Sequence, residues 1–230
     1  MLGIIGAMEV EVEGLKSQMT QVKVEKKAGM DFFAGKISDR DVVVVRSGVG
    51  KVNAAICTQI LIDDFQVDAV VNTGIAGSLK AEIDISDIVL STDAIEHDMD
   101  ARNFGYDWGV IPQMDHSVFV ADDTLREKAK AACLKVNPDI HVFEGRVVSG
   151  DQFISDREKK EFLVSTYQAY CTEMEGAAIA HTADLNGVPF LIIRAISDKA
   201  DDSASMDYPE FEKLAAKHCM NLVLELVQQW

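Results

Sequence analysis

The sequence predicts an α/β fold with a mostly parallel central sheet flanked by helices. Short apolar runs rich in β-branched residues alternate along the chain with segments of helical period, an order typical of α/β domains. Runs such as Val42–Val45 and Phe190–Ile193 are continuously apolar, which indicates strands covered on both faces. The length of 230 residues suits one large domain or two small ones, and no repeat, low-complexity segment or linker divides the chain.

The individual elements follow from the same patterns. Met8, Val12, Leu15 and Met19 form a narrow apolar stripe at helical spacing, and the Ala-rich stretch 174–186 is typical of a helix packed closely on several sides. Ligand sites in such folds lie beyond the carboxyl ends of the strands, so the strand-to-helix junctions are the first places to search. In chain order we expect a strand at Leu2–Ile5, a helix at Met8–Met19, strands at Asp31–Ile37 and Asp41–Arg46, a helix at Lys51–Phe65, strands at Ala69–Asn72 and Asp87–Ser91, a helix at Asp122–Leu134, a strand at His141–Ser149, helices at Asp156–Ser165 and Met174–Asn186, a strand at Phe190–Ile196 and a helix at Tyr208–Val227.

Composition and charge exclude several classes of function. Asp and Glu number 38 against 22 Lys and Arg, which gives a net charge of −16, and the basic residues form no cluster. We therefore expect no nucleic-acid partner and no binding to anionic membranes. The chain has no run of 18 apolar residues, and its N-terminus lacks the basic start and long apolar stretch of a signal peptide. These features predict a cytoplasmic protein.

The residues that commonly bind metals are scattered. The four cysteines form no CxxC pair, and we expect reduced, partly buried thiols. The five histidines lack metal-ligand spacing; where His97 lies near Asp98 and Asp100, an ordinary hydrogen-bonded loop is favoured over a metal site. We expect neither a metal nor another cofactor. A Gly-x-Ser-x-Gly motif is also missing, which argues against a serine hydrolase.

Two glycine-rich segments resemble phosphate loops only superficially. The segment Gly48–Lys51 has Val52 where a Walker loop needs Ser or Thr, and a dinucleotide fingerprint starting at Gly48 would need Gly where Asn53 stands. The segment Gly74–Gly77 is too short for either motif. These glycines indicate tight turns or close contact with a ligand, and the sequence favours neither.

Charged residues stand at positions where the pattern predicts burial. Glu11 lies at the edge of the apolar stripe of the first helix, where it either reaches solvent or faces a site. Glu175 either belongs to a site or, with Glu173, favours the positive end of a helix dipole. Arg194 interrupts an apolar strand and must pair with carboxylates. Asp198 follows just past the expected end of that strand, which favours a functional role over a structural ion pair.

Six short segments occur in a specific order, and together they resemble the 5′-methylthioadenosine/S-adenosylhomocysteine nucleosidases of the nucleoside phosphorylase superfamily. The likeness runs from residue 3 to the last helix. The segments are Gly3-Ile-Ile-Gly-Ala-Met-Glu-Val-Glu11, Ser47-Gly-Val-Gly-Lys-Val-Asn-Ala54, Asn72-Thr-Gly-Ile-Ala-Gly77, Ser149-Gly-Asp-Gln-Phe-Ile154, Glu173-Met-Glu175 and Arg194-Ala-Ile-Ser-Asp198. The resemblance implies a single domain, 1–230, with a mixed, partly barrel-like sheet flanked by helices. It also implies cofactor-free hydrolysis of the bond between adenine and a 5′-thio-substituted ribose, in methionine salvage and clearance of the methyl-cycle by-product.

The resemblance assigns the catalytic groups. Asp198 matches the acid that protonates N7 of the leaving purine, a role that needs a raised pKa. Glu11 matches the base that activates the attacking water, so the two carboxylates have opposite proton duties, as in glycoside hydrolases. Arg194 matches a residue near the water and its carboxylate partners. Glu175 matches the acceptor of the two ribose hydroxyls, and Ser197 matches a helper of Asp198.

The resemblance also assigns the substrate-binding surface. Phe153 matches the ring that stacks on adenine, Ile154 the backbone that contacts the adenine edge, and Met174 a packing surface for the sugar. Further expected binding residues are Ala76, Gly77 and Tyr208.

Three positions depart from the family pattern. Ile75 stands where some members have a Ser that helps to hold the water, so positioning of the water would depend more on Glu11 and Arg194. Tyr208 stands where Phe is frequent and should still close over the ribose. Arg102 replaces a small polar residue, which affects the expected preference for the 5′-substituent.

Three other functions are alternatives to the nucleosidase that the resemblance implies. A phosphorylase of the same superfamily needs a basic cradle for phosphate, whereas the segment near Gly6 offers Glu9, Glu11 and Glu13 and no Arg. A hydrolase for a related 5′-substituted nucleoside of menaquinone synthesis could use the same site. A nucleoside-binding protein without catalysis is the third, and the presence of a base argues against it.

The stretch from His97 to Met114 predicts an interface. It contains Pro112, two glycines and large apolar residues that include Phe104, Tyr106, Trp108, Ile111 and Met114, and it has neither helical nor strand period. Exposed apolar loops of this kind mark interfaces. The resemblance implies a homodimer in which Phe104 and Pro112 line the 5′-substituent pocket of the neighbour; the alternative is a loop folded back on its own domain.

Overall fold

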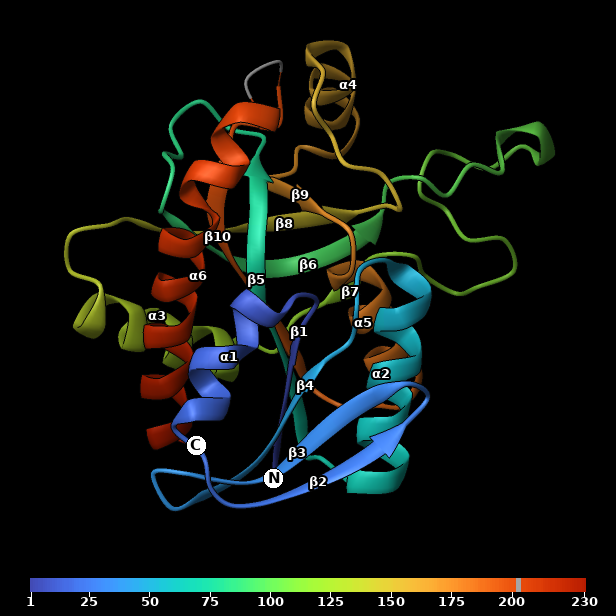
Figure 1. Cartoon of the computed structure of the whole chain (residues 1–230). Helices are drawn as coiled ribbons and strands as arrows, with labels where there is room; N and C mark the ends of the chain where they lie inside the picture. Colours follow the sequence, from blue (N-terminus) through green and yellow to red (C-terminus); the bar gives the residue numbers. More distant parts are fainter. Residues whose placement is uncertain (202–203) are drawn as a thin grey trace.

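The protein is described by a computed structural model that covers residues 1–201 and 204–230 (Figure 1). Its ten-stranded sheet has the order β10-β6-β8-β9-β5-β1-β4-β3-β2, with β7 paired to β6. The strands are β1 (Leu2–Gly6), β2 (Thr20–Lys27), β3 (Met30–Ile37), β4 (Arg40–Arg46), β5 (Ala69–Ser78), β6 (Ile88–Glu96), β7 (Phe119–Val120), β8 (Val142–Ser149), β9 (Cys171–Glu173) and β10 (Phe190–Asp198).

The sheet is mixed, as the resemblance implied. Its centre is parallel, because β1 pairs with β4 and β5, and β5 pairs with β10 in the same direction. The β2–β3 hairpin extends this centre in antiparallel register. On the other side β10 also pairs with β6, so β5, β10, β6, β8 and β9 close on one another as a ring of strands. Every residue of β5 and β10 is buried, which explains their continuous apolar runs.

Helices cover both faces of the sheet (Figure 1). On one side α6 packs on β5 and β10 and is flanked by α1 and α3, while α2 packs against α5 on the other. A Cβ at Gly14 would lie 2.0 Å from the sulfur of Met220, so glycine permits the close α1–α6 contact. The helices are α1 (Glu9–Ser17), α2 (Lys51–Phe65), η1 (Arg102–Phe104), α3 (Asp123–Val136), α4 (Arg157–Tyr167), α5 (Gly176–Leu185) and α6 (Ala204–Gln228).

The structure corrects several predicted boundaries. β2, β7 and β9 were not predicted, and β5 and β6 each extend at least five residues beyond their predicted ends. β2 was missed because most of its residues are exposed and polar, and β9 has only three residues. Asp198 lies within β10 rather than after it, next to a register shift. Glu175 is the N-cap residue of α5 rather than part of the helix.

The segment between β6 and β7 leaves the body of the fold (Figure 1). It carries η1, and Phe104 at the end of η1 is 83% exposed. All four cysteines are free, and they are fully buried, where partly buried thiols were expected. Across the described ranges 1–201 and 204–230, the structure contains no helix long and apolar enough to cross a membrane.

Candidate active site

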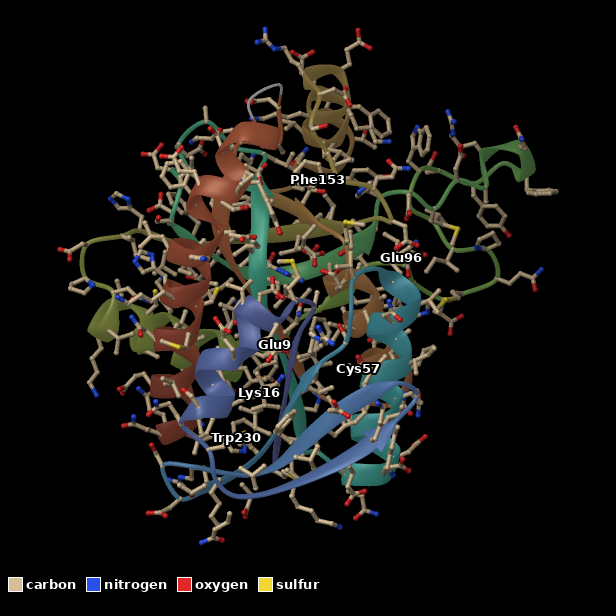
Figure 2. The ribbon with its side chains drawn as sticks, viewed as in Figure 1. Glu9, Lys16, Cys57, Glu96, Phe153 and Trp230 are labelled. Carbon is tan, nitrogen blue, oxygen red and sulfur yellow. The ribbon has the colours of Figure 1, made fainter. Side chains whose placement is uncertain are left out.

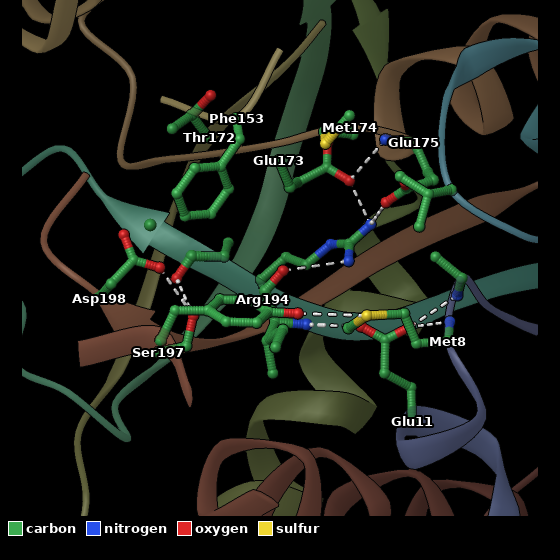
Figure 3. Close-up of a pocket in the computed structure, with 16 residues that line it drawn as sticks. Met8, Glu11, Phe153, Thr172, Glu173, Met174, Glu175, Arg194, Ser197 and Asp198 are labelled. Carbon is green, nitrogen blue, oxygen red and sulfur yellow. Dashed lines mark hydrogen bonds and ion pairs between the residues drawn. The ribbon is translucent and has the colours of Figure 1, made fainter. Parts of the chain in front are cut away.

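A cavity of about 310 Å³ lies where the carboxyl ends of β1, β5, β9 and β10 meet. Most of its lining is apolar, with carboxylates, one guanidinium and hydroxyl groups among it (Figure 3). Its position is the one expected from the topology, because these strand ends bring residues distant in sequence to one edge. The lining residues are Ala7, Met8, Glu11, Val49, Ile75, Ala76, Gly77, Phe153, Thr172, Glu173, Met174, Glu175, Arg194, Ser197, Asp198 and Tyr208.

The carboxylate of Glu11 is held at the start of α1. Its side chain is only 3% exposed, and it accepts hydrogen bonds from the backbone N–H groups of Ala7 (2.6 Å) and Met8 (2.9 Å) at one oxygen. The other oxygen accepts the backbone N–H of Ile75 at 3.2 Å. Burial raises the pKa of Glu11, while the charge of Arg194 and these hydrogen bonds oppose the rise. The result is a fixed carboxylate with the raised pKa of a proton acceptor.

Arg194 organises the middle of the cavity. Its guanidinium is 1% exposed and donates to Asn72 Oδ1 at 2.5 Å and to the carboxylate of Glu173. It also lies 3.5 Å from the carboxylate of Glu175. The sequence required carboxylate partners for a buried Arg, and Glu173 and Glu175 supply them.

Glu175 is positioned by backbone as well as by charge. One of its oxygens accepts the N–H of Gly50 at 2.9 Å, and Gly50 has φ of +98°, a conformation that favours glycine. Burial, and then the neighbouring charge of Glu173, raise the pKa of Glu175 to about 7. The glycine turn at 48–50 therefore has a definite role, because it brings the start of α2 against this carboxylate.

Asp198 lies at the opposite end of the cavity from Glu11 (Figure 3). Its carboxylate accepts the hydroxyl of Ser197 at 2.9 Å and the backbone N–H of Ala200 at 2.8 Å. Burial raises the pKa of Asp198, and these hydrogen bonds oppose the rise. A carboxyl group with a raised pKa is suited to carrying a proton near neutral pH.

Gly74 lets two of these groups approach each other. A Cβ at this position would lie 2.2 Å from Nη1 of Arg194 and 2.6 Å from Oε1 of Glu11. No side chain fits there without displacing one of them. Gly77 has the same function at the other end, because a Cβ there would lie 2.7 Å from Oδ1 of Asp198.

Aromatic residues border the cavity near Asp198. The rings of Phe153 and Tyr208 meet edge to face with centroids 5.8 Å apart, and Phe153 is 51% exposed. The hydroxyl of Tyr208 lies 3.2 Å from the sulfur of Met8. A half-exposed ring at the mouth of an otherwise buried cavity is available for stacking on a planar ligand.

Most of the residues singled out in the sequence come together here. Ile154 lies in a small adjoining cavity of about 30 Å³, which shares Phe153 and Asp198 with the larger one. Phe104 and Pro112 line neither cavity of this chain. The predicted residues in the main cavity are Glu11, Ala76, Gly77, Phe153, Met174, Glu175, Arg194, Ser197, Asp198 and Tyr208.

Sequence reasoning missed part of the polar framework. Glu173 was considered only as a helix-dipole residue, yet it accepts from Arg194, from Ser149 Oγ and from the N–H of Gly176 at 2.8 Å. The sequence gives Asn72 only as a strand end and as part of a family segment, whereas its side-chain oxygen accepts from Arg194. Within the part of the chain that is described, no group of three or more His, Cys, Asp or Glu side chains is arranged to hold a metal ion.

Comparison with known proteins places this geometry in a family. The model of the phosphorylase superfamily matches residues 1–228. A 5′-methylthioadenosine/S-adenosylhomocysteine nucleosidase of Staphylococcus aureus (strain JH9) is 41% identical over 230 residues, which is the whole of both chains. The nucleosidase of the same name from Neisseria meningitidis, crystallised with methylthio-immucillin-A, has a TM-score of 0.95 at 38% identity and covers 100% of this chain and 99% of its own. Futalosine hydrolase of Helicobacter pylori strain 26695 has a TM-score of 0.94 at 32% identity, covering 100% and 97%. The chain therefore belongs to the phosphorylase superfamily and, within it, to the 5′-methylthioadenosine/S-adenosylhomocysteine nucleosidases.

Proposed function

We propose that the protein hydrolyses the N-glycosidic bond of 5′-methylthioadenosine and S-adenosylhomocysteine, releasing adenine and the 5′-thio-substituted ribose. The observation that carries this proposal is the placement of two carboxylates with raised pKa values at opposite ends of one cavity. Asp198 stands at one end and Glu11 at the other, with Arg194 and Glu173 between them (Figure 3). Such a pair can protonate a leaving group at one side and activate water at the other.

At the leaving-group end, adenine would stack on Phe153 and direct N7 toward Asp198. Breaking the bond builds negative charge on the purine, and a proton from Asp198 neutralises it. The hydroxyl of Ser197 fixes the orientation of the carboxyl group. Ile154 in the adjoining cavity, with Ala76 and Gly77, would contact the edge of the base.

At the other end, Glu11 would accept a proton from water as that water attacks the anomeric carbon. Both oxygens of Glu11 are oriented by backbone N–H groups, so the base is already in position. Ile75 has no side-chain donor, and its contribution is the backbone N–H that it gives to Glu11. Glu175 would accept the two ribose hydroxyls, with Met174 and Tyr208 packing against the sugar.

The arrangement favours water over phosphate as the nucleophile. Among the described residues that line the cavity, Arg194 is the one cation, and Asn72, Glu173 and Glu175 already occupy its guanidinium. A phosphate ion would meet Glu11 and Glu175 instead of a basic cradle. The phosphorylase alternative is therefore disfavoured.

The test is incubation of the purified protein with 5′-methylthioadenosine, with and without phosphate, followed by identification of the sugar product. We expect free 5′-methylthioribose and adenine at the same rate in both, and no loss of rate with a chelator. A ribose 1-phosphate product, phosphate-dependent turnover or binding without turnover would each overturn the proposal. A parallel incubation with futalosine tests the substrate named for the Helicobacter pylori protein.

We further propose a homodimer that completes the 5′ end of the site. The support is the projecting segment between β6 and β7, on which Phe104 is 83% exposed, together with exposed Val49, Val52 and Ile56 at the start of α2. Phe104 and Pro112 line neither the main cavity nor the adjoining one of their own chain, so a 5′-substituent pocket lined by them would belong to a partner.

Phe104→Ala should raise KM for 5′-methylthioadenosine several-fold and leave adenine inhibition unchanged, because only the 5′ group would contact that ring. Sedimentation equilibrium should give twice the chain mass. A fully active monomer at assay concentration would contradict this arrangement.

We also propose a reducing, cytoplasmic location for the protein. The four buried free thiols support it.

A further inference from the structure

A second hollow, of about 640 Å³, adjoins the active-site cavity. The two share Ala7, Met8 and Val49 as a common wall. Its other walls include Glu9 and Lys16 from the two ends of α1, the β2–β3 turn and the loop after β4. The active-site cavity and this hollow therefore meet at the side chains of Met8 and Val49.

The walls of the hollow differ from those of the active site because they are charged. Lys16 and Glu9 form a close pair at 2.9 and 3.1 Å along one side of α1, where Figure 2 shows them one above the other. The ammonium of Lys16 also lies 4.6 Å from the centre of the Phe33 ring. Both charges of this pair are therefore satisfied by their neighbours.

Arg46 and Asp31 have no such close partner. The nearest carboxylate to Arg46 is Glu9, at 3.7 Å from Nε, which is longer than a hydrogen bond, and Lys16 already occupies that carboxylate. Among the described residues, no hydrogen bond or ion pair is found for the Asp31 side chain. The hollow thus presents one guanidinium and one carboxylate, each with unused hydrogen-bonding capacity.

Strand register places these two groups side by side. β3 and β4 are antiparallel with Phe32 opposite Val45, and continuation of that register by one residue brings Asp31 opposite Arg46. Directly opposed residues carry their side chains on the same face of the sheet, with Cβ atoms about 5 Å apart. The hollow therefore holds a positive and a negative group that come from neighbouring positions on adjacent strands.

We propose that this hollow binds the α-amino-acid end of a 5′-thio substituent, with Arg46 receiving the α-carboxylate and Asp31 the α-ammonium. The inference rests on the proposed nucleosidase function and adds a specificity site to it. The thioether carbons pass the apolar wall of Met8 and Val49, and the two charges at the end of the substituent meet their complements beyond it. Guanidinium–carboxylate pairing provides the orientation. A methylthio group carries no charge, so it has nothing to pair with either residue.

The test compares kcat and KM for S-adenosylhomocysteine and 5′-methylthioadenosine in Arg46→Gln and Asp31→Asn. Each variant should raise KM for S-adenosylhomocysteine about fivefold, the size of a partly exposed ion pair, with kcat and the methylthio substrate within twofold of wild type. Arg40→Gln, at the other end of β4, and Asp39→Asn, in the β3–β4 turn, are the matched controls and should change neither substrate.

Substrates with half of the zwitterion separate the two roles. A 5′-carboxyalkylthio adenosine should be sensitive to Arg46→Gln alone, and a 5′-aminoalkylthio adenosine to Asp31→Asn alone. Equal effects on the charged and methylthio substrates, or no effect on either, would overturn the subsite. If wild-type protein hydrolysed neither substrate, the proposed function would fail by itself, and calorimetric Kd values for the same ligands and variants would still decide the subsite.

Discussion

Asp198→Asn is expected to lower kcat for 5′-methylthioadenosine by about 10²–10⁴-fold, because an amide keeps a hydrogen bond to the purine but cannot deliver a proton. Among the described residues the carboxylate accepts hydrogen bonds from the Ser197 hydroxyl and the N–H of Ala200, so an amide oxygen can still accept from either one. The variant should therefore fold and bind adenine. Stopped spectrophotometric assays of adenine release measure the rate, and thermal denaturation checks the fold.

Ser197→Ala is the control for Asp198→Asn. It removes one hydrogen bond to the carboxylate but leaves the proton donor in place, so its loss of kcat should be far smaller. Turnover near that of wild type in Asp198→Asn, or an equal loss in both variants, would remove Asp198 from the role of acid.

Glu11→Gln should lower kcat by a similar 10²–10⁴-fold while substrate binding is retained, because an amide cannot accept the proton of the attacking water. Its size is conserved, but its NH₂ group must face either the N–H of Ile75 or those of Ala7 and Met8, and the hydrogen bonds on that side are lost. Glu13→Gln, two residues along the same helix and exposed, is the matched control and should behave as wild type. A Glu11→Gln enzyme that retained its rate would show that another group activates the water.

The two carboxylates act on opposite limbs of the pH profile. Glu11 must be ionised, so kcat/KM should fall as pH drops through its raised pKa. Glu175 has a pKa of about 7 and contributes to the same acidic limb, because only its ionised form is a strong acceptor for the ribose hydroxyls. Asp198 must be protonated, so activity should fall as pH rises through its own raised pKa. Asp198→Asn should remove the alkaline limb and leave the acidic one, measured as kcat/KM between pH 5 and 9.

Local patterns in the sequence were sufficient for much of the fold. Continuous apolar runs identified β4 and β10, and the bounds Lys51–Phe65 of α2 were predicted without error; the helix begins after Gly50 and ends before Gln66, both of which have positive φ. β2 was missed because it is an edge strand whose residues mostly face solvent, so no burial pattern marks it. The extensions of β5 and β6 were missed because Thr, Asn, Gly and Asp interrupt their apolar runs. These residues still belong to the strands, since the closed ring of strands buries polar side chains as well as apolar ones.

The sequence by itself determined that Glu11, Arg194 and Asp198 are charges in buried surroundings, since each interrupts an apolar pattern and such groups need partners. Tertiary structure alone decided what those partners are. Glu173 and Asn72 reach Arg194 because β5, β9 and β10 end at one edge, and Gly74 and Gly77 have no side chain to separate the groups that meet there. The raised pKa values of Glu11 and Asp198 likewise arise from burial by residues remote in the chain, a property of the assembled cavity that no local pattern contains.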